Sequence, residues 1–233
     1  MLEVQGLHTY YGRAHILADV GFEVVQGEVL VLLGRNGAGK STTMKSIMGL
    51  VPAAQGRIQF KGIDIAGKQA FEIARLGIGY VPEERRIFTE LTVEENLEVG
   101  RRPPAADAPS WTFDKLFTLF PNLARMRDRA GSQMSGGEQQ MLTIARTLMG
   151  NPAFLLLDEP SEGLAPVIIE QMAKTILDLK REGLTVLLSE QNLRFAQAVA
   201  DRALIIEKGR IRFTGTMADL MANDAVRTQY LSL

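Results

Sequence analysis

The feature that most constrains the fold is an uninterrupted apolar run that ends in a glycine-rich loop. Residues 29–33 read Val-Leu-Val-Leu-Leu, and Gly-Arg-Asn-Gly-Ala-Gly-Lys-Ser follows at once. A strand that is apolar at every position must be buried on both faces, as in the centre of a parallel sheet. The loop matches the pattern G-x-x-x-x-G-K-[ST], whose backbone N–H groups surround phosphate. The segment therefore predicts a strand, a phosphate-binding loop and a helix in an α/β protein.

Each residue type in this loop has a chemical reason. Glycines let the backbone curl so that successive N–H groups face the phosphates of a nucleotide, and the following helix adds its dipole. Lys40 would hold the terminal phosphates and Ser41 would ligate Mg²⁺, whereas a plain glycine turn explains neither residue. The candidate nucleotide-binding residues are Gly34, Arg35, Asn36, Gly37, Ala38, Gly39, Lys40 and Ser41.

Strand-like and helix-like segments alternate along much of the chain, which predicts a parallel sheet with helices on its faces. The 233 residues fit one α/β domain with an inserted helical lobe over about residues 84–150. Thr92 and Glu95 have the spacing of a capping box at a helix start, and three prolines within 101–110 predict a loop. Expected strands are 2–7, 20–25, 57–60, 63–65, 78–81, 154–157, 184–188, 203–207 and 211–213; expected helices are 69–75, 91–99, 111–120, 166–182 and 193–200.

Composition narrows the classes of function. Lysine and arginine number 26 against 27 aspartates and glutamates, a net charge of −1 that argues against a protein that mainly neutralises nucleic-acid phosphates. The chain has no cysteine, which excludes disulfides, thiolate zinc sites and cysteine nucleophiles, and has only two histidines, His8 and His15. No apolar run approaches the roughly 20 residues of a membrane span, and the N-terminus lacks a signal-peptide layout. We expect a soluble intracellular protein that binds no nucleic acid.

A second apolar run ends in two carboxylates. Residues 154–157 read Phe-Leu-Leu-Leu and lead into Asp158 and Glu159. Asp158, at the tip of a buried strand beside the phosphate loop, can hold Mg²⁺ through water, and Glu159 can polarise water for in-line attack on a γ-phosphate. Many apolar strands end in aspartate, so the prediction depends on the phosphate loop upstream.

Ser135, Gly136 and Gly137 form a third motif at a helix start. Ser135 and Glu138 have capping-box spacing, which is one sufficient reason for the serine. Two glycines in a first turn each cost up to about 1 kcal/mol against alanine, so a second constraint is expected. Glycines leave the N–H groups open at the positive helix end, which suits close approach to a phosphate. Because the chain's own loop already surrounds its nucleotide, that phosphate would be held by a second subunit.

With these motifs in this order, the chain resembles the ATP-binding subunit of ABC transporters over essentially its whole length. The resemblance implies a P-loop NTPase of the α/β class, with a mainly parallel core sheet, an N-terminal antiparallel β-subdomain and an inserted α-helical lobe. Residues 1–83 and 151–233 would form the ATP-binding core, and 84–150 the lobe that carries the signature. It also implies an ATPase that uses ATP and Mg²⁺, in a head-to-tail dimer with two ATP molecules between one subunit's phosphate loop and the other's signature.

The resemblance assigns further residues. Tyr11 matches the aromatic that stacks on adenine, although by itself it is equally compatible with a core aromatic. The Walker A loop extends from Gly34 to Thr42, the signature covers 135–139, and the Walker B strand covers 155–159. Residues 161–166 match the D-loop.

Two positions depart from the family pattern, both where the γ-phosphate would be sensed. The family usually has glutamine after Val-Pro, where this chain has Glu83, and histidine where this chain has Gln191. Gln191 can still donate a hydrogen bond to the γ-phosphate or hold a water, but it cannot become cationic. Glu83 is an anion that binds Mg²⁺ more directly or repels the γ-phosphate. The candidate catalytic residues are thus Glu159, Gln191 and Glu83, the candidate Mg²⁺ ligands are Ser41, Asp158 and Glu83, and we expect ATP to bind and hydrolysis to be modest.

Five segments narrow the resemblance: VPEERRIF, MSGGEQQML, DEPSEGLAP, SEQN and NDAVRTQYL are similar to the second ATPase subunit of branched-chain amino-acid importers, the LivF type. This implies a LivG-like ATPase partner or a second copy, two membrane permeases and, indirectly, a substrate-binding protein. The chain would sit peripherally on the cytoplasmic face of the inner membrane, with residues 85–88 either contacting the permease or forming a solvated turn.

Other functions remain open at this point. Importers of urea or short amides use similar subunits, and the transported substrate never touches the ATPase. A P-loop GTPase or nucleotide kinase is a lower alternative, because no N-K-x-D guanine reader is found and neither class explains Ser135-Gly136-Gly137. An ABC protein outside transport, as in repair or translation, generally carries tandem domains or coiled-coil insertions.

Overall fold

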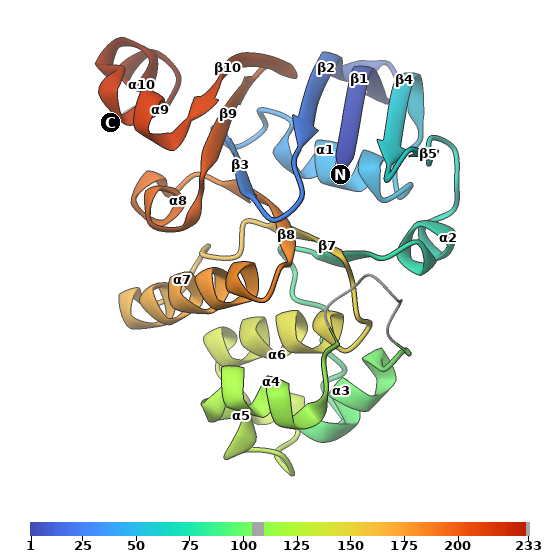
Figure 1. Ribbon diagram of the computed structural model, residues 1–233, viewed down its shortest axis with the longest axis vertical. Coiled ribbons are helices and arrows are strands. Elements are labelled where there is room, and N and C mark those ends of the chain that lie inside the picture. Colours follow the sequence, from blue (N-terminus) through green and yellow to red (C-terminus); the bar gives the residue numbers. More distant parts are fainter. Residues whose placement is uncertain (104–109, 232–233) are drawn as a thin grey trace.

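Two β-sheets and a helical lobe make up the computed structural model, which describes residues 1–103 and 110–231 (Figure 1). Most of the proline-rich loop expected at 101–110 lies outside the described residues. The strands are β1 (Leu2–Tyr11), β2 (Ala14–Val24), β3 (Val29–Leu33), β4 (Ala53–Phe60), β5 (Ile63–Asp64), β6 (Ile78–Val81), β7 (Phe154–Asp158), β8 (Thr185–Glu190), β9 (Arg202–Glu207) and β10 (Arg210–Thr216). The helices are α1 (Lys40–Ile47), α2 (Ala70–Arg75), α3 (Val93–Gly100), α4 (Phe113–Leu119), α5 (Pro121–Ala124), α6 (Gly136–Leu148), α7 (Pro166–Arg181), α8 (Leu193–Val199), α9 (Met217–Ala222) and α10 (Asp224–Leu231), with a 3₁₀ turn at Gly131–Gln133.

The larger sheet has the strand order β10-β9-β3-β8-β7-β6. Its pairs are parallel except β10 with β9, which confirms the mainly parallel core. Every residue of β3 and β7 is buried. Alternate β3 side chains enter different clusters: Val29, Val31 and Leu33 pack with the lobe and α7, and Leu30 and Leu32 pack with α1 and the N-terminal strands. Burial of each such side chain stabilises the fold by about 1.5–3 kcal/mol. Because its side chains enter both clusters, β3 connects the two hydrophobic cores.

The smaller sheet, β2-β1-β4-β5, is antiparallel, as the family resemblance implies. The expected strands 2–7 and 20–25 are shorter than the observed ones, because β1 runs on to Tyr11 and β2 begins already at Ala14. Gly6 has φ +56° and lies within the register shift between Val4 and Leu7, so β1 continues through an irregularity. Pairing across the tight hairpin between β1 and β2, such as Tyr10 opposite His15, extends both strands beyond the expected bounds.

Helices α3 to α6 lie between β6 and β7 in the chain and form the helical lobe below the core sheet in Figure 1. Thr92 accepts from the Glu95 N–H and Glu95 accepts from the Thr92 N–H, which confirms the predicted capping box of α3. No element is expected after residue 213, yet β10 runs to Thr216 and α9 and α10 follow. Thr216 and Asp219 form a capping box there, a signal that the sequence contained.

None of the helices in the described ranges is long and apolar enough to cross a membrane.

Candidate nucleotide-binding site

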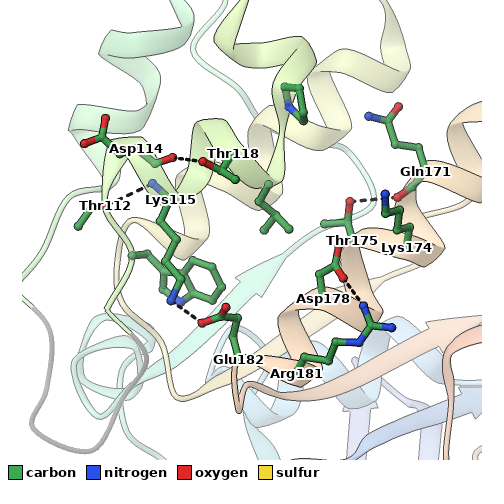
Figure 2. Close-up of a pocket in the computed structure, with 13 residues that line it drawn as sticks. Thr112, Asp114, Lys115, Thr118, Gln171, Lys174, Thr175, Asp178, Arg181 and Glu182 are labelled. Atoms are coloured by element: carbon green, nitrogen blue, oxygen red, sulfur yellow. Dashed lines mark hydrogen bonds and ion pairs between the residues drawn. The ribbon is translucent and has the colours of Figure 1, made fainter.

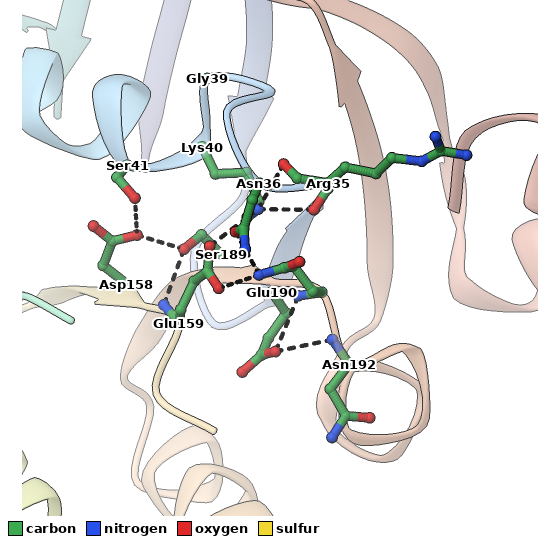
Figure 3. A network of polar contacts seen from close by, with 12 residues as sticks. Arg35, Asn36, Gly39, Lys40, Ser41, Asp158, Glu159, Ser189, Glu190 and Asn192 are labelled. Carbon is green, nitrogen blue, oxygen red and sulfur yellow. Dashed lines mark hydrogen bonds and ion pairs between the residues drawn. The ribbon is translucent and has the colours of Figure 1, made fainter. Parts of the chain in front are cut away.

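The site lies where three neighbouring parallel strands end. Leu33, the last residue of β3, is opposite Glu190 of β8, and Ser189 of β8 is opposite Asp158 of β7. Because parallel strands have their carboxyl ends at one edge, the loops after them meet there. Figure 3 shows the polar network that results.

The loop after β3 depends on glycine at the start of α1. Gly39 is the N-cap of α1 with φ +115°, and a Cβ there would lie 2.8 Å from Leu17 Cδ2. Both the conformation and the close approach therefore require glycine. Lys40 is the first residue of α1, as the loop pattern predicts. Thr42 is buried in the first turn of the same helix.

Lys40 is only 3% exposed, and its ammonium is fully engaged. Nζ donates to the carbonyls of Gly34 at 2.7 Å and Arg35 at 3.1 Å, and it lies 3.0 Å from Glu159 Oε1. A buried ammonium held by carbonyls and one carboxylate is a cation positioned for an anion. The structure thus brings Lys40 and Glu159, predicted separately, into one ion pair.

The Asp158 carboxylate accepts hydrogen bonds from three hydroxyl groups. Oδ1 accepts from Ser41 at 3.0 Å and from Ser189 at 2.6 Å, and Oδ2 accepts from Tyr80 at 3.1 Å. Burial, followed by the Asp158 charge, raises the pKa of the Tyr80 phenol well above its ordinary value. Sequence reasoning missed Tyr80 and Ser189, because each lies inside an ordinary strand.

Glu159 is held in an uncommon backbone conformation, with φ +45°, and is largely buried. Gln191 Nε2 donates to Glu159 Oε2 at 2.7 Å and to Asn36 Oδ1 at 2.7 Å. Burial alone would raise the pKa of the Glu159 carboxyl, but the hydrogen bonds from Gln191 and Lys40 outweigh it, so the pKa is lowered. Glu159 is therefore an ionised acceptor, and a cavity of about 450 Å³ opens between it, Asn36 and Gln191.

Two more carboxylates crowd this edge. Desolvation and then the charges of Glu159 and Asp158 raise the pKa of exposed Glu83, so the structure brings Glu83 to the same negative cluster. A hydrogen bond with Glu159, followed by desolvation, raises the pKa of Glu162. The negative charge accumulated here is what a divalent cation would neutralise.

Glu190 is a buried carboxylate that sequence reasoning did not single out. Oε1 accepts from the Ser161 N–H at 3.1 Å, and Oε2 accepts from the N–H groups of Gln191 and Asn192, both at 3.1 Å. Desolvation raises the pKa of Glu190 despite these three hydrogen bonds. Through these hydrogen bonds, Glu190 connects the D-loop at 161–166 with the segment that contains Gln191.

The oxygen ligands are suited to Mg²⁺. Ser41 and Asp158 already lie within hydrogen-bond distance of each other, and a hydroxyl with one or two carboxylates is how Mg²⁺ is commonly bound beside phosphates. Within residues 1–103 and 110–231, no group of three or more histidine, cysteine, aspartate or glutamate side chains could hold a metal. The residues thus fit a magnesium ion that takes most of its ligands from phosphate and water.

The signature lies in the lobe, away from this network. Ser135 caps α6, and Glu138 accepts from the Ser135 N–H at 2.7 Å, so the capping interpretation is correct. The glycines also have reasons within the subunit. A Cβ on Gly136 would meet Arg85, and one on Gly137 would lie 3.0 Å from Ile168. Among the described residues, Lys40, Ser41 and Glu159 make no hydrogen bond or ion pair with Ser135, Gly136 or Gly137.

Tyr11 lies at the end of β1 and is 48% exposed. The alternative of a core aromatic is therefore wrong. An exposed ring remains available to stack on a base, which stays a prediction.

Another cavity, with a volume of about 710 Å³, lies elsewhere, between α4 and α7 (Figure 2). Four of its charged side chains pair with one another: Lys115 with Glu182 at 2.5 Å, and Arg181 with Asp178 at 2.6 Å. These pairs neutralise the four side chains within the cavity, unlike the carboxylates gathered at the end of the core sheet.

Comparison with known proteins identifies the family of the chain. The family model described as ABC transporter matches residues 17–162, which is more than half of the chain. The chain is 47% identical over 231 residues to the high-affinity branched-chain amino acid transport ATP-binding protein BraG of Pseudomonas aeruginosa, covering 99% of each. It is 39% identical to the lipopolysaccharide export system ATP-binding protein LptB of Haemophilus influenzae, covering 99% of this chain and 97% of LptB. A crystal structure of the ADP conformation of an ATP-binding cassette of an ABC transporter superposes with a TM-score of 0.82 at 28% identity, covering 97% of this chain and 96% of that chain.

Proposed function

This chain belongs to the ABC transporter family, and on that premise we propose that it is the ATP-hydrolysing subunit of an importer for branched-chain amino acids. The observation that carries the ATPase is the contact of Glu159 with both Lys40 and Gln191 at the end of the core sheet. The similarity to BraG over nearly the full length of both chains supports the substrate. The lower identity to LptB shows that similar subunits also serve export.

ATP would lie with its adenine on Tyr11 and its phosphates in the loop from Gly34 to Thr42. Lys40 would exchange its contact with Glu159 for the terminal phosphates. Ser41 and Asp158 would hold Mg²⁺, with Glu83 as a further ligand. When bound, Mg²⁺ supplies positive charge to the β- and γ-phosphates.

The chain's own residues then favour attack by water. Glu159, whose pKa is held down by Gln191 and, before the nucleotide binds, also by Lys40, would accept a hydrogen bond from the attacking water. Gln191 orients that carboxylate through Oε2 and would donate to the γ-phosphate or the water. Because Gln191 is neutral, it adds no cation at this position, and we expect modest hydrolysis.

The site is incomplete in one chain. Ser135, Gly136 and Gly137 would meet the phosphates of ATP held by a second ATPase subunit, either a copy of this chain or a non-identical, LivG-like protein, in a head-to-tail dimer. Two permeases would complete the transporter at the cytoplasmic face of the inner membrane, fed by a substrate-binding protein. A cavity of about 280 Å³ lined by exposed Phe88 and Val99 suits an apolar permease segment, whereas Ile87 packs into the lobe.

Purified chain assembled with its permeases tests the proposal. Glu159→Gln should retain ATP binding and lose ATP hydrolysis by at least about 100-fold, because the amide cannot accept the water proton. Uptake of labelled leucine, with urea as the comparison substrate, decides between the amino-acid importer and the urea or amide alternative. Failure to isolate any permease with the chain would contradict a role in transport.

A further inference from the structure

The turn before the lobe holds an arginine in an uncommon conformation. Arg85 and Arg86 are consecutive non-glycine residues with φ +62° and +51°. Both carbonyls are held by α6: Thr143 Oγ1 donates to the Arg85 carbonyl at 2.8 Å, and Arg146 donates to the Arg86 carbonyl at 2.6 Å. The helix that begins at the signature therefore fixes the direction of this turn.

The Arg85 guanidinium lies against the first residue of that helix. A Cβ built on Gly136 would be 2.5 Å from Nη1, 3.2 Å from Cζ and 3.3 Å from Nη2. The side chain thus covers the glycine, and any larger residue at position 136 would displace it. This contact by itself requires glycine at position 136.

Charge makes this placement unfavourable without a further partner. The N-terminus of α6 carries positive partial charge, and a guanidinium beside it adds a full positive charge. In the described part of the chain no carboxylate pairs with Arg85, whereas its neighbour Arg86 lies 3.6 Å from Glu84. Two positive groups that meet at one point favour an anion there.

We propose that Arg85 contacts the terminal phosphate of the ATP held by a second copy of this chain, beside Ser135 and Gly136. The inference rests on the proposed function, which brings that phosphate to the signature. Arginine suits the role because its planar fork donates several hydrogen bonds to phosphate and stays charged. It supplies from the opposing subunit the positive charge that neutral Gln191 does not supply within the site.

The test uses the full chain with Glu159→Gln as parent, so that bound ATP persists. Association is measured by analytical ultracentrifugation with MgATP and with MgADP, and nucleotide binding to single copies is measured by calorimetry. Arg85→Gln should weaken MgATP-driven association by about 10- to 100-fold, the range of a hydrogen bond to a charged group, with ATP affinity of the single copy unchanged within about twofold. Arg85→Lys should recover part of the loss, and the matched control Arg86→Gln should associate as the parent does.

Each other result is decisive. Arg85→Gln that associates like the parent overturns the proposal, and so does a variant that loses ATP binding together with association, because Arg85 would then be structural. A parent that binds ATP without associating overturns the role of Arg85 and leaves the ATPase proposal standing. A parent that binds no MgATP overturns the proposed function itself.

Discussion

Gln191 connects two halves of the site that are far apart in the chain. Its single amide nitrogen reaches Asn36, 155 residues away, and Glu159, 32 residues away. The family resemblance assigns the position to γ-phosphate sensing, but only the structure shows that Gln191 also holds the carboxylate. The same residue would thus orient Glu159, the proposed acceptor of the water proton.

Removing the Gln191 amide should therefore slow hydrolysis. In the assembled transporter we expect Gln191→Ala to lower the ATPase rate about 10-fold or more, since Glu159 loses an oriented donor. Gln191→His should exceed the wild-type rate at low pH and introduce a titration near the ordinary histidine pKa of about 6.5. Gln197→Ala, an exposed glutamine on α8, is the control. An unchanged rate in both Gln191 variants would show that this residue does not tune hydrolysis.

Glu190 gives a prediction about pH. Its pKa is raised above the ordinary 4.5 by burial, so the folded state binds this proton more readily than the unfolded state. Its contribution to stability is then present below pH 4.5 and is lost as pH rises through the raised pKa. In urea unfolding of the nucleotide-free chain, Glu190→Gln should flatten the fall in stability above pH 4.5.

The same variant should be less stable overall, by about 1–3 kcal/mol, because an amide N–H cannot accept from Ser161. Glu3→Gln, on an exposed position of β1, should leave the pH profile unchanged. If Glu190→Gln reproduced the wild-type pH slope, another group would be responsible for it.

At the scale of elements, helix starts were the most predictable features. The capping boxes at Thr92 and Ser135 can be recognised from a short stretch of sequence, since the capping residue and its partner lie three residues apart. What local pattern missed is how α3 anchors the turn before it. Asn96 is fully buried, accepts from the Phe88 N–H at 2.9 Å and donates to the carbonyls of Phe88, Leu91 and Thr92.

Asn96→Ala should therefore destabilise the lobe without touching the nucleotide. We expect a loss of about 1–3 kcal/mol in the free energy of unfolding, because the Phe88 amide would be left without its acceptor. ATP affinity of the single chain should stay within about twofold. Asn122→Ala, at an exposed position of α5, serves as the control. Unaltered stability in Asn96→Ala would mean that water replaces these hydrogen bonds.

At the scale of the whole molecule, the nucleotide would join the carboxyl edge of the core sheet to the N-terminal sheet that carries Tyr11. A ligand that binds only the folded chain stabilises it by mass action. MgATP at about 100 times its dissociation constant should add about 2.7 kcal/mol, a rise in Tm of roughly 5–10 °C for a chain of this size.

Differential scanning fluorimetry checks this rise in Tm. Lys40→Ala should abolish most of it, because the buried ammonium that would hold the phosphates is gone. An equal shift in wild type and Lys40→Ala would contradict binding through this loop.

The sequence alone determined which chemistry the chain carries. The phosphate loop, the carboxylate pair Asp158-Glu159 and the capped glycines at 135–137 are contiguous, and contiguous patterns act through local backbone geometry. For the same reason the fully apolar run 29–33 predicted a strand buried on both faces, which the two hydrophobic clusters confirm.

Only the tertiary structure decided which of these groups meet. Asp158 accepts hydrogen bonds from the hydroxyl groups of Ser41 and Tyr80, which lie 117 and 78 residues away. The Arg85 side chain lies over Gly136. Such contacts follow from the order of strands in the sheet and from how the lobe packs on it. The periodicity of one strand or helix does not specify which elements pack beside it. These pairings are decided when the burial of many side chains, far apart in the sequence, favours one arrangement of the elements.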